Sequence, residues 1–138
     1  MEITPKILLQ NAELYEAESA LSVRDQEGNW HQTNWSDLYA EIMDISKALF
    51  ACGVGINDKV SIYSYNRKEW NGCYAATQLI NSVAVGVYHT SSSNEVEWVV
   101  GNSDSKIVFL GNNPNDNNEP EKMPNHRLLT ILDNLDKV

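Results

Sequence analysis

The chain has 138 residues, of which 42% are hydrophobic and 21% are charged, proportions typical of a folded globular protein. Asp and Glu number 19 against 10 Lys and Arg, and the resulting net charge of −9 disfavours binding to nucleic acid. No apolar run approaches the roughly 20 residues of a membrane-spanning helix, and the first residues lack the basic and apolar segments of a secretory signal. We therefore expect a cytoplasmic protein.

The cysteines and histidines give little support for a disulfide or a metal site. Cys52 and Cys73 are too few for a disulfide framework and are not spaced as paired metal ligands, so both are expected to be buried thiols on helices. The histidines lie far apart in the sequence, at His31, His89 and His126. We predict no bound metal.

The first third of the chain begins with a helix and a hairpin. Threonine and proline open residues 4–15, where apolar residues recur at helical spacing, which predicts a short amphipathic helix. Residues 20–25 and 30–33 alternate as strands on either side of a polar turn that contains Gly28.

The clearest helical pattern follows the hairpin, with apolar residues at spacings of four, three and four: Leu38, Ile42, Ile45 and Leu49. Asn34 is expected to be the N-cap, and Gly53 can adopt the left-handed conformation that ends a helix. The predicted boundaries are near Trp35 and Cys52.

Three strand patterns, at residues 60–65, 83–88 and 106–110, alternate with two helical patterns. The second is apolar on both faces, which is typical of a central parallel strand. Because strand–helix–strand crossovers are right-handed, this alternation predicts an α/β fold with a doubly wound, mostly parallel open sheet and helices on both faces. The N-terminal helix and hairpin would be additions to this sheet.

Both helices between these strands have the signature of a capping box. Asn66 and Glu69 would start a helix that reaches about Asn81. Ser92 and Glu95 would start the next, whose inner stripe consists of Val96, Val99 and Val100.

The pattern changes near the end of the chain. Asparagine and proline dominate residues 111–125, which predicts a solvent-exposed or mobile loop, and a strand pattern returns at 126–133. The chain then ends without the helix that would cover this strand. We therefore expect residues 1–138 to be an incomplete unit that self-associates through an exposed sheet edge.

Few residues are candidates for chemistry. Gly53 and Gly55 begin like a dinucleotide-binding fingerprint but follow a helix, and the sequence has neither a Walker loop nor a serine elbow. Tyr88, Thr90 and Ser91 lie at and just beyond the carboxyl end of an apolar strand, where open parallel sheets bind ligands, so they are the candidate substrate-binding residues.

A structural role for the same region stays open as an alternative, in which Ser92 and Ser93 compete to cap the next helix and Thr90 closes a turn. Trp70 is expected to pack within the fold rather than to form a substrate wall. We predict no catalytic, cofactor-binding or metal-binding residue in this chain.

Several segments occur in an order that is informative when they are taken together: residues 35–39, 48–54, 58–63, 66–70, 87–92, 95–96 and 102–109. In this order they resemble the N-terminal region of AMP-forming, long-chain acyl-CoA synthetases, which belong to the adenylate-forming superfamily. This chain has Asn57 where the family usually has glycine, Lys68 where it usually has proline, and His89 where it often has proline. Asparagine tolerates the left-handed conformation, and lysine is acceptable in a first helical turn.

The resemblance implies a ligase in which ATP and a fatty acid give an acyl-adenylate and pyrophosphate, after which coenzyme A displaces AMP. ATP, Mg²⁺ and coenzyme A would serve the longer parent enzyme, and the partner of this chain would be the remainder of the synthetase after Val138. The catalytic motifs of the family lie beyond the region of resemblance, so the 138-residue chain would be structural and inactive. A membrane-peripheral location of the parent stays open, as does the alternative of a free-standing α/β ligand-binding or regulatory module.

Overall fold

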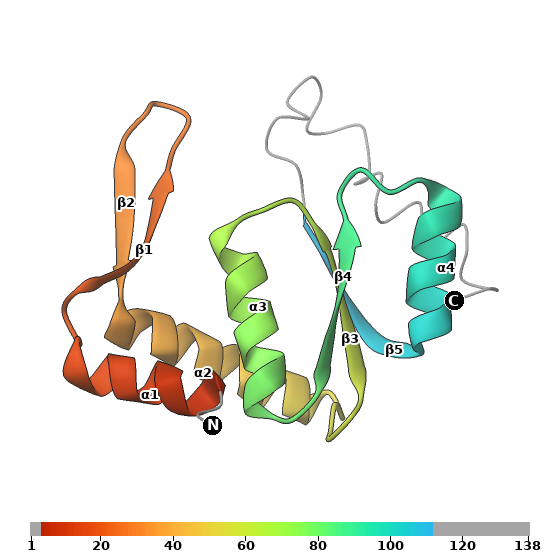
Figure 1. The fold of residues 1–138 in the computed structure, drawn as a ribbon, viewed down its shortest axis with the longest axis horizontal. Coiled ribbons are helices and arrows are strands. Elements are labelled where there is room, and N and C mark those ends of the chain that lie inside the picture. Colours follow the sequence, from red (N-terminus) through yellow and green to blue (C-terminus); the bar gives the residue numbers. More distant parts are fainter. Residues whose placement is uncertain (1–3, 112–138) are drawn as a thin grey trace. The chain divides into compact units, whose positions relative to one another are not determined.

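The computed structural model describes residues 4–111 and divides them into two compact units (Figure 1). The helical unit contains residues 4–56 and 67–82, and the sheet unit contains residues 57–66 and 83–111. The predicted strand at 126–133 and nearly all of the predicted loop at 111–125 lie outside the described residues.

The helical unit contains three helices and a hairpin: α1 (Thr4–Leu14), β1 (Ser19–Arg24), β2 (Trp30–Asn34), α2 (Trp35–Ala51) and α3 (Lys68–Leu79). The two strands pair antiparallel, which confirms the predicted hairpin. Within residues 4–111, no helix combines the length and the apolar character that crossing a bilayer requires.

Helix α2 begins and ends as its sequence predicts. The side chain of Asn34 accepts a hydrogen bond from the N–H of Asp37 at 2.7 Å, which satisfies one of the free amides of the first turn. Gly53 follows the helix with a φ of 85°, a conformation that costs glycine little. Three of the four predicted apolar residues, Leu38, Ile42 and Leu49, are buried.

Helices α2 and α3 approach each other closely because the residues between them are small. A Cβ atom on Gly72 would lie 3.3 Å from the Ile45 side chain, and Ala76 is fully buried. The Ser46 hydroxyl makes hydrogen-bond contacts to the carbonyls of Ile42, at 2.8 Å, and of Ala76, at 3.2 Å. These contacts satisfy a buried polar group at the contact between the two helices.

The prediction that both cysteines are buried is half right. Cys73 is buried on α3, whereas Cys52 is exposed because it lies at the C-cap of α2, where the chain turns at Gly53.

The sheet unit contains β3 (Lys59–Ser64), β4 (Val83–Tyr88), α4 (Ser93–Ser103) and β5 (Ser105–Leu110). Its three strands are parallel and lie in the order β4-β3-β5, which confirms a mixed α/β fold with a parallel sheet.

Within the described sheet, residues 83–88 do not form the central strand. β3 is the central strand of the described sheet, and its residues Val60 to Tyr63 are each at most 1% exposed. β4 is an edge strand of that sheet, with Val83 43% exposed and Tyr88 81% exposed. An apolar run indicates a strand, but the order of the strands depends on which neighbours it pairs with.

The core of the sheet unit lies between α4 and the strands. Val96 and Val100 from the predicted inner stripe of α4 cluster with Tyr63 and Val87, and all four are at most 3% exposed. Partly buried apolar residues pack around this cluster: Val99, Val108 and Leu110. The inner stripe predicted for α4 is therefore confirmed.

Candidate functional site

The candidate site lies in the sheet unit, at the carboxyl ends of β3 and β4. The two strands are paired in parallel up to Ser64 opposite Tyr88. Because they run in the same direction, the residues that follow Ser64 and Tyr88 leave the sheet at the same edge.

The direction of the chain across the sheet reverses between β3 and β5. β3 leads to β4, its neighbour on one side, whereas β4 leads to β5, which pairs with β3 on the other side (Figure 1). Such a reversal is a topological switch point, and open parallel sheets bind ligands outside the carboxyl ends of the strands there. The switch point therefore lies between β3 and β5, and the turn after β4 lies at the carboxyl edge of the sheet on the other side of β3.

The three predicted substrate-binding residues, Tyr88, Thr90 and Ser91, belong to one turn. The N–H of Ser91 donates to the carbonyl of Tyr88 at 3.0 Å, with His89 and Thr90 between them. Tyr88 and Thr90 are exposed, and Ser91 is half-buried. The structure thus brings the three residues together. His89, which stands where the family that this sequence resembles often has proline, belongs to the same turn.

Ser92 caps α4 through a reciprocal capping box. Its hydroxyl accepts the N–H of Glu95 at 3.4 Å, and the Glu95 carboxylate accepts the N–H and the hydroxyl of Ser92 at 2.7 and 2.9 Å. The capping role predicted for Ser92 is confirmed, while Ser93 is the first helical residue rather than a competing cap. The hydrogen bond from the Ser92 N–H, followed by the one from its hydroxyl, holds the pKa of the Glu95 carboxyl below its ordinary value.

The start of α3 corrects a prediction, because Asn66 is not its N-cap and the helix ends at Leu79 rather than near Asn81. Arg67 holds the N-cap position, and within residues 4–111 no side-chain hydrogen bond caps this helix. Asn66 is instead exposed directly after β3.

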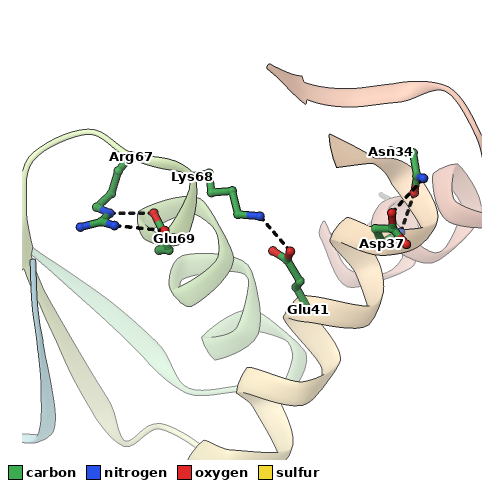
Figure 2. Close-up of polar contacts among 6 residues, drawn as sticks. All are labelled: Asn34, Asp37, Glu41, Arg67, Lys68 and Glu69. Atoms are coloured by element: carbon green, nitrogen blue, oxygen red, sulfur yellow. Dashed lines mark hydrogen bonds and ion pairs between the residues drawn. The ribbon is translucent and has the colours of Figure 1, made fainter. Parts of the chain in front are cut away.

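Charged pairs stabilise the first turn of α3 in place of a cap (Figure 2). Arg67 donates from Nε and Nη2 to the two carboxylate oxygens of Glu69, at 2.7 and 3.1 Å. This interaction holds the pKa of Glu69 below its ordinary value. Lys68 Nζ lies 2.8 Å from Oε1 of Glu41 on α2, so the second pair joins two helices of the helical unit.

Tyr65 and Asn66 were missed as site residues by the sequence reasoning. They follow β3 as His89 and Thr90 follow β4, and so they leave the sheet at the candidate edge. Their position at the end of a strand pattern was the available signal, but the sequence predicts Tyr65 as the last residue of the strand at 60–65 and Asn66 as a helix start.

Trp70 packs within the helical unit as predicted. It is half-buried, and its ring stacks on that of Tyr74 with centroids 5.7 Å apart and an interplanar angle of 14°. Aromatic pairs of this kind contribute to packing.

An open hollow of about 500 Å³ lies along α4, and its described lining consists of Asn94, Glu97, Trp98, Gly101 and Asn102. None of these residues belongs to the predicted site. Across residues 4–111, no group of three or more His, Cys, Asp and Glu residues is placed to hold a metal ion.

The parallel sheet and its switch-point edge define a mixed α/β protein whose ligands are expected at the carboxyl ends of the strands. The sequence model of the family described as AMP-binding enzyme matches residues 8–137, and the chain belongs to this family.

Among similar proteins, the long-chain-fatty-acid CoA ligase FadD15 of Mycobacterium bovis is 30% identical over 60% of this chain and 14% of its own length. A crotonobetaine/carnitine CoA ligase of Proteus mirabilis is 26% identical over 88% of this chain and 23% of its own length. The chain thus spans less than a quarter of these ligases.

Solved structures agree in fold. The N-terminal domain of FACL13 from Mycobacterium tuberculosis superimposes with a TM-score of 0.73 and 18% identity, and the match covers 100% of this chain and 37% of that domain.

Proposed function

We propose that this chain is the N-terminal portion of a long-chain fatty-acid CoA ligase. The family match over residues 8–137 is the observation that carries this proposal, and the ligase names of the relatives support it. In the proposed reaction, ATP and a fatty acid form an acyl-adenylate and pyrophosphate, and the thiol of coenzyme A then displaces AMP. The whole enzyme would be cytoplasmic and would use ATP, Mg²⁺ and coenzyme A.

Residues 1–138 would be a structural subdomain of this enzyme and would be inactive alone. The first turn of α4, at the candidate site, does not fit a nucleotide phosphate because the Glu95 carboxylate already accepts the hydrogen bonds of Ser92 there. Phosphate binding and catalysis would belong to the remainder of the enzyme after Val138, because the resemblance to the family places its catalytic motifs there.

At the candidate edge, Tyr88, Thr90 and Ser91 would contact the substrate rather than take part in catalysis. Their common turn and the exposure of Tyr88 and Thr90 support this role. The exposed Asn66, at the end of the neighbouring strand, would contribute to the same edge.

Isothermal titration calorimetry of the chain with ATP and magnesium, with and without a long-chain fatty acid, tests whether residues 1–138 bind nucleotide by themselves. We expect no saturable heat in either titration. Saturable binding of ATP would contradict the proposal and would favour a free-standing ligand-binding module.

The coding sequence after Val138 provides a second test. A Ser/Thr/Gly-rich phosphate loop in the same reading frame would support the proposed ligase. A chain extended through that region should form acyl-CoA from ATP, fatty acid and coenzyme A, whereas residues 1–138 should not. An extended chain that folds but forms no acyl-CoA would contradict the proposed reaction.

A further inference from the structure

We draw no further inference here: the strongest candidate, the open hollow along α4 beside the exposed Trp98, has a described lining from this one helix alone, and nothing among residues 4–111 shows what covers it.

Discussion

A Cβ atom on Gly111 would overlap the hydroxyl of Ser64 and lie 2.5 Å from the Cβ atom of Ser64. Gly111 follows β5, and its N–H donates to the carbonyl of Tyr63 on β3 at 2.9 Å. The ends of two neighbouring strands therefore come so close together that a side chain at position 111 requires the backbone or Ser64 to move.

Gly111→Ala should lower the free energy of unfolding by about 1–3 kcal/mol, the usual cost of overpacking a close contact. Urea denaturation followed by circular dichroism measures this change. Adding Ser64→Gly removes the overlapping atoms, so the double variant should lose less stability than the sum of the two single variants.

Gly53→Ala is the matched control for this pair. No atom lies within 4 Å of a Cβ placed on Gly53, and its cost arises from the φ of 85° alone. The loss of stability caused by Gly53→Ala should simply add to that caused by Ser64→Gly, because Ser64→Gly removes no atom that Gly53→Ala would overlap. Full additivity between Gly111→Ala and Ser64→Gly would show that the two residues do not constrain each other.

The ion pair between Glu41 and Lys68 should stabilise the contact between α2 and the uncapped start of α3. A double-mutant cycle with Glu41→Gln and Lys68→Gln should give a coupling free energy of about 0.2–1 kcal/mol that falls at high salt. The pair Asp44–Lys47 is the control, because both side chains are more exposed and belong to one helix, so its coupling should be smaller. A coupling indistinguishable from that of the control would contradict a role for Lys68 in holding α3.

The hairpin should keep one carboxylate ionised in strongly acidic solution. His31 Nε2 lies 2.6 Å from Asp25 Oδ2, and this bond, followed by the one from the N–H of Asn29, lowers the pKa of Asp25 to about 2. A lowered pKa in the folded state means that the contribution of Asp25 to stability is complete above the ordinary carboxyl pKa of about 4 and is lost as the pH falls towards 2.

NMR titration of the Asp25 carboxyl carbon measures this pKa directly. We expect a midpoint near 2 in the unmodified chain and a higher midpoint after His31→Gln. An unmodified midpoint near 4, or one that does not respond to His31→Gln, would rule out the interaction in solution.

The two thiols should react at very different rates. Cys52 is exposed, whereas burial is the main cause that raises the pKa of Cys73 to about 11, with a smaller effect from the charge of Glu69. Because the thiolate is the reactive form, Ellman's reagent should modify Cys52 quickly and Cys73 only slowly or after unfolding. In Cys52→Ser the fast phase should disappear, and a fast phase that remains would place Cys73 at the surface.

The isolated chain should self-associate through β4, an edge strand of the described sheet with exposed apolar residues. Sedimentation velocity at increasing concentration should show this association, and Val83→Lys should reduce it. Ile56→Lys is the control, since Ile56 is 72% exposed but does not belong to the sheet. Equal effects of the two substitutions would indicate general apolar association rather than edge pairing.

The sequence predicted elements well where the local chemistry decides the outcome. Asn34 and Ser92 cap helices because their short polar side chains reach the nearby amides, and this depends on neighbours three residues away. The alternative in which Thr90 closes a turn agrees with the turn from Tyr88 to Ser91 in the structure.

Contacts between distant segments explain what the sequence reasoning missed. Residues 83–88 were expected to be central because they are apolar on both faces. The central strand is instead β3, where the Ser61 hydroxyl lies 2.7 Å from that of Ser105, a residue of β5. Such a hydrogen bond lets a polar residue occupy a central strand. The start of α3 differs from the prediction by one position, because Arg67 rather than Asn66 is its N-cap, and among the described residues no side-chain hydrogen bond marks that start.

The position of β3 between β4 and β5 also has a consequence for synthesis. On the ribosome β3 is made first, and both of its hydrogen-bonding partners follow later in the chain. Pairings between distant segments form slowly, and an unpaired apolar strand is a template for wrong partners. The growing chain should therefore be most prone to aggregation in the interval after β3 has emerged and before β5 has been made.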